Sequence, residues 1–359
     1  MIKSKHVTKS GLCLALALPI LISLLASKPG NVGIKKQTQY LNSRDPGKPI
    51  LLPSFFISGE RFYIKLPTLK GDTILGYCDT GGGISMVMPA TIDKLNLQTK
   101  IQKAKIKGII GINYVPFNDV VSSQDIPPPI QLPGMNLSHH FKKVTDPFLY
   151  VPPANGEMKM MTESMHLDVF FGQDFFMGKA WTMDYIHRKI WVNTPLASRE
   201  EGNPGVQRIG IRKDSKGKPT HGHPSMYIEV DGEKIDVLFD TGATIILSDN
   251  GKKALNTADK TIGGSFIAVS VFEKWHKEHP DWKVYEKADM SRDIIEVPKV
   301  NIGGHLVGPV LFAERPDENW SKGMISSMDK VVKGAIGGSG LKYLKVQIDY
   351  NSELIKFDE

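Results

Sequence analysis

The triplet Asp-Thr-Gly occurs twice in the chain, at Asp79–Gly81 and at Asp240–Gly242. A chain of 359 residues with average composition contains one such triplet by chance in about 6% of cases, and two in fewer than about 1%. Each triplet directly follows an apolar run that predicts a strand, Leu75–Cys78 in the first instance and Val237–Phe239 in the second. Two equivalent strand ends that each carry a carboxylate constrain the fold to two related units that can share one site.

The sequence around the two triplets repeats as well. The runs Phe62–Leu66 and Met226–Val230 come before them, and each predicts a β-hairpin that ends at the aspartate. Downstream, the segments Val169–Gly172 and Gly334–Gly337 end 93 and 97 residues after the respective aspartates. Both segments consist of apolar residues closed by a glycine.

Each half of the chain ends in a matching segment, Trp181–Ile190 and Val346–Ile355, and each segment predicts a terminal strand. Their Asp-Tyr pairs are 165 residues apart, close to the 161 residues that separate Asp79 from Asp240. A register kept over this length indicates two copies of one fold.

These motifs resemble those of the pepsin-like and retropepsin-like aspartic proteases, and the resemblance covers roughly residues 49 to 359. It implies an all-β fold with short helices: two similar β-barrel-like lobes of the acid protease fold, with the active-site cleft between them. It also implies that Asp79 and Asp240 are the catalytic pair, and that each following threonine hydrogen-bonds across to the other loop. The residues that support the pair are then Thr80, Gly81, Thr241 and Gly242.

Two carboxylates placed close together cannot both ionise at low cost, so one proton is held and the pair titrates as a unit. One member can then act as general base and the other as general acid, and the sequence leaves open which does which. Pepsin-like relatives usually carry Ser or Thr after the triplet, whereas this chain has Gly82 and Ala243. Without these hydroxyl donors we expect a raised pKa for the pair and an optimum at weakly acidic pH.

A cleft protease also needs a flap that covers the substrate. Two segments are candidates, Lys107–Tyr114 and Thr261–Val269, and the alternative for each is a plain β-turn. The candidate flap residues are Gly111, Tyr114, Gly263, Gly264 and Phe266.

The ends of the chain and its turn-rich stretches suggest five parts. Three lysines followed by the apolar run 11–26 predict that residues 1–26 are a signal peptide or an uncleaved N-terminal anchor. We therefore expect an exported protein, periplasmic or secreted, or one anchored to the inner membrane by residues 11–26. Residues 27–48 read as a flexible lead or a short activation segment, 49–195 as the N-terminal lobe, 196–205 as a linker and 206–359 as the C-terminal lobe.

Charge, cysteine count and histidine spacing limit the classes of partner and ligand that we expect. The formal net charge of +7 falls to about +4 without the signal, because Lys3, Lys5 and Lys9 leave with it, so no nucleic-acid partner is expected. Cys78 would then be the one remaining cysteine, and its apolar strand predicts a buried structural thiol. The His221-Gly-His223 and His276–His279 motifs lack further ligands at suitable spacing, so they read as loop or surface residues, and no metal or cofactor is predicted.

The leading hypothesis is a monomeric aspartic endopeptidase that takes an extended peptide or protein substrate. The alternatives are a non-catalytic peptide- or protein-binding module on the same scaffold, and a retropepsin-like site formed between two chains. The charged and aromatic segment Val271–Lys287 has no counterpart in the first half, and it is either a rim of the cleft or a solvated surface helix and loop.

Overall fold

The computed structural model describes residues 47–58, 60–102, 112–135 and 146–359. Strands hold 39% of the residues and helices 19%, so the protein is mainly β, as the sequence predicts. The described strands form sheets of eight, nine, six and two strands, each with two edges, so they make no closed barrel. The predicted signal or anchor (1–26) and the predicted lead up to residue 46 lie outside the described residues.

The described elements alternate between strands and short helices. Those of the first half are β1 (Ile50–Leu52), β2 (Ser54–Ile57), β3 (Arg61–Pro67), β4 (Thr73–Cys78), β5 (Met86–Val87), α2 (Pro89–Leu95), β6 (Lys100–Gln102), β7 (Ile112–Pro116), α3 (Phe117–Val120), β8 (Phe148–Val151), α5 (Gly156–Met165), β9 (Val169–Phe171), α6 (Gln173–Phe176), β10 (Ala180–Asp184), β11 (Lys189–Val192) and the 3₁₀ turn η1 (Ser198–Glu200). Those of the second half are β12 (Val206–Arg208), β13 (Ser225–Val230), β14 (Glu233–Phe239), β15 (Thr244–Ile246), α7 (Asp249–Ala254), β16 (Thr261–Gly263), β17 (Ser265–Ala268), α8 (Val269–Glu278), β18 (Lys283–Asp289), β19 (Arg292–Val297), β20 (Val300–Ile302), β21 (His305–Val307), β22 (Val310–Arg315), the π-helical turn η2 (Asn319–Gly323), the 3₁₀ turn η3 (Met324–Ser326), β23 (Gly334–Ile336), α9 (Gly338–Leu341), β24 (Lys345–Asp349) and β25 (Leu354–Asp358).

The repeat in the sequence is a repeat in strand pairing. In the first half β4 runs parallel to β9, and β5 runs antiparallel to β9. In the second half β14, β23 and β17 take the same three places. The predicted hairpins are confirmed, because β3 pairs with β4 and β13 pairs with β14, and in both halves the second strand ends immediately before the aspartate.

Local sequence explains the hairpin of the second half. Asp231 and Gly232 connect β13 to β14, and both have positive φ, at 49° and 80°. A two-residue turn with positive φ at both positions matches the right-handed twist of the flanking strands, and Asp-Gly is one of the pairs that adopts it readily. The turn therefore fixes the register that delivers Asp240 to the end of β14.

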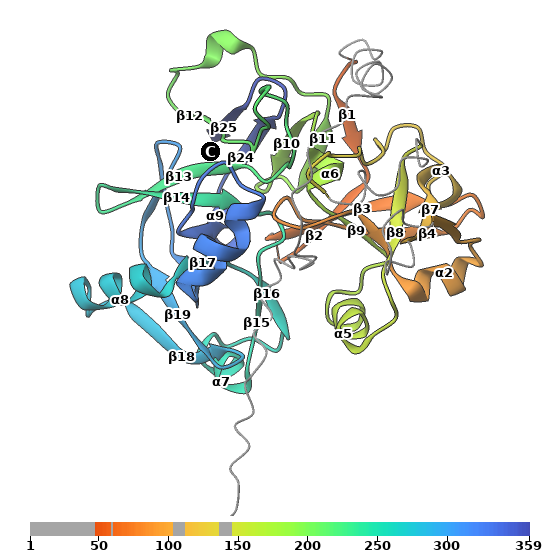
Figure 1. Ribbon diagram of the computed structural model, residues 1–359. Helices are drawn as coiled ribbons and strands as arrows, with labels where there is room; N and C mark the ends of the chain where they lie inside the picture. Colours follow the sequence, from red (N-terminus) through yellow and green to blue (C-terminus); the bar gives the residue numbers. More distant parts are fainter. Residues whose placement is uncertain (1–46, 59, 103–111, 136–145) are drawn as a thin grey trace, which may run out of the picture.

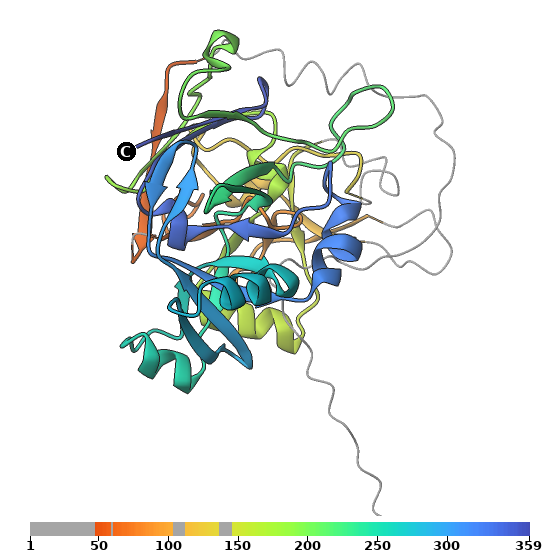
Figure 2. The same ribbon diagram turned by 90° about the vertical axis from the view of Figure 1, so that its left-hand side faces the viewer.

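The two halves share a six-stranded sheet in the order β1-β11-β10-β24-β25-β12. Its centre is the antiparallel pair β10 and β24, in which Trp181 lies opposite Ile348. Figure 1 shows these strands along the top of the molecule, from β12 above the second half, coloured green to blue, to β1 above the first half, coloured orange to yellow-green, and Figure 2 shows β1 on the same side as the C-terminus. Each predicted terminal strand is in fact a hairpin, because the turn after each Asp-Tyr pair reverses the chain.

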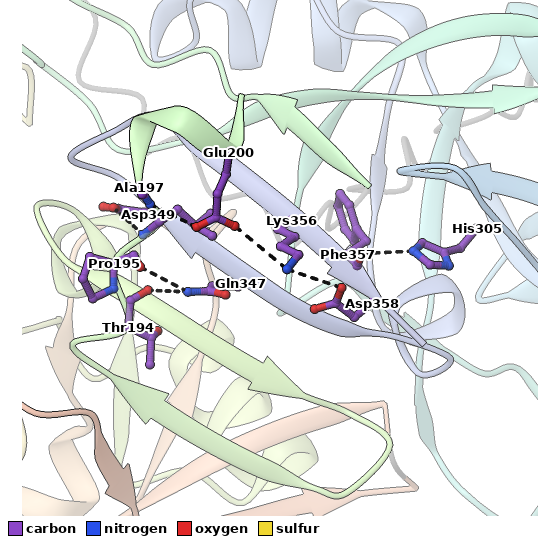
Figure 3. A network of polar contacts seen from close by, with 11 residues as sticks. Thr194, Pro195, Ala197, Glu200, His305, Gln347, Asp349, Lys356, Phe357 and Asp358 are labelled. Carbon is purple, nitrogen blue, oxygen red and sulfur yellow. Dashed lines mark hydrogen bonds and ion pairs between the residues drawn. The ribbon is translucent and has the colours of Figure 1, made fainter. Parts of the chain in front are cut away.

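The predicted linker 196–205 is held against this sheet from its first residue. The backbone N–H of Leu196 donates to Asp349 (3.1 Å), and the Gln347 amide donates to the carbonyl oxygen of Thr194 (2.7 Å). Figure 3 shows these contacts together with the hydrogen bond between His305 Nε2 and the carbonyl oxygen of Phe357 (3.0 Å). The connection between the halves is thus fixed to the shared sheet at its start.

Two further predictions concern helices. The predicted helix at 89–97 is present as α2. The segment 271–287 is less exposed than either sequence interpretation suggests, because Phe272 and Trp275 of α8 are buried and the Trp275 ring packs edge-on against Phe312 at 5.3 Å. Residues 283–287 of that segment belong to β18, which pairs with β19. The buried apolar residues of α8 lie three residues apart, which is the spacing of a helix that covers a sheet with one face.

We expect Gly172→Ala to destabilise the protein by about 1–3 kcal/mol, because a methyl group there overpacks the interior. A Cβ at Gly172 would lie 2.0 Å from the carbonyl oxygen of Gly83, whereas one at Gly156 would meet nothing within 4 Å. Denaturant unfolding of both alanine variants measures the difference, with Gly156→Ala as the matched control. Equal midpoints for the two variants would contradict the close approach.

Candidate active site

The two aspartates occupy equivalent positions at the ends of equivalent strands. The backbone N–H of Asp79 donates to Phe171, and that of Asp240 donates to Ile336, both at 2.9 Å. In each half this bond ties the aspartate to the apolar-apolar-Gly strand beside it. Both side chains are buried, at 3% and 6% exposure, so their environment rather than bulk water governs their protonation.

The two threonines connect the loops reciprocally. Thr80 Oγ1 donates to the carbonyl oxygen of Phe239 (2.7 Å), and Thr241 Oγ1 donates to that of Cys78 (3.0 Å). The same hydroxyl oxygens accept the backbone N–H of the opposite threonine, at 3.0 and 3.1 Å. The structure therefore brings together the threonine pair that the sequence predicts, and Cys78, a buried free thiol, supplies one of the acceptors through its backbone.

The glycines of the triplets lie against the carboxyl groups of the opposite loops. A Cβ built on Gly81 would lie 2.6 Å from Asp240 Cγ, and one built on Gly242 would lie 2.1 Å from Asp79 Cγ. Any larger residue at either position would push the loops apart. With glycine at both positions, the two carboxyl groups come close enough to share a hydrogen bond.

Burial raises the pKa of both carboxyls. For Asp79 burial is the largest cause, and the charge of Asp240 and the hydrogen bond to it raise its pKa further, against the lowering effect of the N–H groups of Gly81 and Gly82. Burial raises the pKa of Asp240 to about 6, against the lowering effects of Asp79 and of the N–H groups of Gly242 and Ala243. Near neutral pH the pair therefore carries one proton, as a general acid and base pair requires.

A serine supports each loop at matching places in the two halves, which the sequence interpretation missed. In both halves the N–H of the glycine after the apolar pair donates to this serine; the pairs are Gly172 with Ser85 (3.1 Å) and Gly337 with Ser265 (3.0 Å). Ser85 Oγ also donates to Asp174 (2.6 Å), and Ser265 shares a hydrogen bond with Ser339 (2.9 Å). Serines outside the triplets carry no sequence signal of their own, so only the fold reveals this role.

His223 lies in the loop before β13, as the sequence interpretation allows, but it is not at the surface. It is buried, its Nε2 bonds the carbonyl oxygen of Gly82 (2.9 Å), and its Nδ1 bonds Ser327 Oγ (3.0 Å). A residue of the second half therefore holds the active loop of the first half. His221 is half-buried, and the hydroxyl of its neighbour Thr220 lies 3.2 Å from its Nδ1.

Glu60 and Arg61 reach across in the opposite direction. Glu60 accepts the N–H of Gly263 (2.9 Å) and forms an ion pair with Lys342 (3.1 Å). Arg61 donates to the carbonyl oxygen of Thr261 (2.9 Å) from a buried position. The first half thus supports the segment that follows the second active loop.

The structure describes four of the five flap candidates. Gly111 lies outside the described residues. Tyr114 belongs to β7, which pairs on both sides, and Phe266 is buried in β17 between β22 and β23. Gly263 ends β16, and Gly264 donates its N–H to Ala243 (3.0 Å). Tyr114, Gly263 and Phe266 therefore lie in paired strands and Gly264 lies between β16 and β17, so none of these four residues is at the tip of a hairpin.

The chain matches no protein-family model and no curated protein sequence. Within the described residues, no group of three His, Cys, Asp or Glu side chains is arranged to hold a metal ion. Among those same residues, no helix is long and apolar enough to cross a membrane.

We expect Thr80→Val and Thr241→Val each to destabilise the protein by about 1–3 kcal/mol, because each leaves buried backbone groups without partners. The two changes should be non-additive, since both threonines belong to one network. Denaturant unfolding of the two single variants and the double variant measures the coupling, with Thr80→Ser as the control that keeps the hydroxyl. Strict additivity would show that the two threonines act independently.

Burial lowers the pKa of His223 to about 4. In the unfolded chain the imidazole binds a proton with the ordinary histidine pKa of about 6.5. The stability that the folded protein has above pH 6.5 is therefore lost as the pH falls towards 4. Between pH 6.5 and 4 the free energy of unfolding of the parent should therefore fall by up to about 3 kcal/mol more than that of His223→Gln. Unfolding measured at several pH values tests this, with exposed His276→Gln as the control. Parallel curves for the parent and His223→Gln would refute it.

Proposed function

We propose that the protein is an aspartic endopeptidase with Asp79 and Asp240 as its catalytic pair. The observation that carries the proposal is the pair of buried carboxyls that share a hydrogen bond at the ends of two equivalent strands. The repeated pairing of β4, β9 and β5 with that of β14, β23 and β17 supports two lobes of the acid protease fold with a cleft between them. The supporting residues are Thr80, Gly81, Thr241 and Gly242.

The pair can hydrolyse a peptide bond without a covalent intermediate. The ionised carboxylate removes a proton from a water molecule as the water oxygen bonds to the carbonyl carbon of the substrate. The protonated carboxyl gives its proton to the carbonyl oxygen, and the product of this step is a tetrahedral diol. When the C–N bond of this diol breaks, the leaving nitrogen takes up the proton gained from water. The other carboxylate recovers its proton from the diol, and the pair returns to its starting state.

The expected substrate is a peptide or protein segment in extended conformation, bound as an added strand. A single chain supplies both aspartates, which supports a monomeric enzyme over a site formed between two chains. Export to the periplasm or outside the cell, or anchoring by residues 11–26, remains the proposal that the N-terminal sequence supports.

We expect the parent chain to cleave a mixed peptide library, and Asp79→Asn and Asp240→Asn each to lower kcat/KM at least about a hundredfold. Cleavage should fall below about pH 6, because the raised pKa of Asp240 leaves the pair without a base there, and it should be greatest at weakly acidic to neutral pH. Product analysis by mass spectrometry across pH 3 to 8 measures both effects, on the full chain in detergent and on the chain from Ser27.

Asp236→Asn, which changes a partly exposed aspartate of the same strand β14, is the matched control and should cleave like the parent. A peptide with a non-hydrolysable hydroxyl isostere should block cleavage. If the parent binds this peptide but cleaves nothing at any pH, the protein is a binding module on this scaffold. An optimum at strongly acidic pH would contradict the raised pKa of the pair.

A further inference from the structure

The two halves differ at one position beside the catalytic pair. Phe170 in β9 and Ala335 in β23 each lie two residues before the loop-supporting glycine. They also share a register, because Phe170 lies opposite Tyr77 and Ala335 lies opposite Leu238, each two residues before its aspartate. A large aromatic ring in one half therefore stands where the other half has a methyl group.

The Phe170 ring occupies the space that a side chain at position 82 would need. A Cβ built on Gly82 would lie 2.4 Å from Phe170 Cζ and 3.0 Å from Asp79 Cγ, so the ring edge and the carboxyl group flank the same small space. In the second half the position equivalent to Gly82 is Ala243, which carries a side chain, and the position equivalent to Phe170 is the smaller Ala335. The absence of a hydroxyl donor at position 82 thus follows from the presence of Phe170.

This difference gives the two carboxyls unequal surroundings. Each carboxyl receives backbone N–H groups of its own loop, Asp79 those of Gly81 and Gly82 and Asp240 those of Gly242 and Ala243, so these bonds do not distinguish the pair. What distinguishes them is the Phe170 ring, which flanks the space beside Asp79. An apolar ring beside a carboxyl group shields it from water, which favours the neutral form.

We propose that Phe170 places the shared proton on Asp79, so that Asp79 acts as the general acid and Asp240 as the general base. Phe170 is a positioning residue in this proposal, which rests on the proposed function for its catalytic consequence. Burial and the charge of Asp240 raise the pKa of Asp79, in the direction that the geometry requires.

The other charged or titratable groups around the pair do not reverse this asymmetry. Burial raises the pKa of the Tyr77, Cys78 and Tyr185 side chains, which keeps them neutral, and lowers that of His223, which keeps it neutral as well. Arg61 is a nearby cation, and its hydrogen bonds go to Thr244 and Thr261. By element, these groups are Tyr77 and Cys78 on β4, Arg61 and Tyr63 on β3, Tyr185 after β10, His223 before β13, and Asp240 itself after β14.

The test titrates each aspartate alone in the full chain, by carboxyl ¹³C NMR after labelling of aspartate. Asp79 in the Asp240→Asn variant should titrate at least about one pH unit above Asp240 in the Asp79→Asn variant. Adding Phe170→Ala with Gly82→Ser to both should close or reverse this gap, because the ring leaves and a hydroxyl donor takes its place. Gly82 is not among the glycines with positive φ, so serine can adopt its backbone conformation.

Phe171→Leu is the matched control, because this neighbour stacks on Phe175 at 3.8 Å and does not flank the space beside Gly82. It should leave the gap unchanged. Equal titration of the two aspartates in the parent background, or a gap that survives Phe170→Ala with Gly82→Ser, would overturn the proposal. If the gap behaves as expected but the parent cleaves no peptide, the proton placement stands and the proposed peptidase activity falls. If cleavage occurs and the gap is absent, only the role of Phe170 falls.

Discussion

The hydrogen bonds between Thr80 and Thr241 are the constraint on which the site depends. Each hydroxyl donates to a backbone carbonyl of the opposite strand end and accepts the opposite threonine N–H. These bonds can form only if the two loops approach so closely that Gly81 and Gly242 touch the opposing carboxyl groups. The same approach excludes water from the carboxyls and raises the pKa of both. One arrangement therefore determines the geometry of the pair and its protonation.

The rest of the fold keeps the two loops in register from both sides. The shared sheet joins the halves through β10 and β24, while His223 from the second half and Glu60 and Arg61 from the first each contact the segment around the opposite loop. Each half is therefore part of the framework of the other. The two aspartates lie between these contacts from the two halves. This position accounts for the low exposure of both carboxyl groups to solvent.

The sequence predicts the mainly β class, both hairpins that end at the aspartates, and the residues of the two triplets, because these depend on strong local patterns. It does not predict that each terminal segment is a hairpin of a shared sheet, since pairing between β10 and β24 joins residues about 165 apart. It also does not predict that His223 is buried, because a loop histidine beside Gly and Pro carries no sequence signal for burial. The sequence also suggests a turn at Phe266, because Gly-Gly before an aromatic residue is typical of a turn. In the structure Phe266 lies in the buried strand β17.

The difference between Phe170 and Ala335 has a consequence for how such a site can evolve. Two identical subunits related by a two-fold axis must place the same residue at both positions, so neither aspartate can differ from the other before a ligand binds. A duplicated chain is free of that restriction, because each copy can change separately. The covalent joining of the halves thus lets a substitution in one copy break the equivalence of two otherwise matched carboxylates.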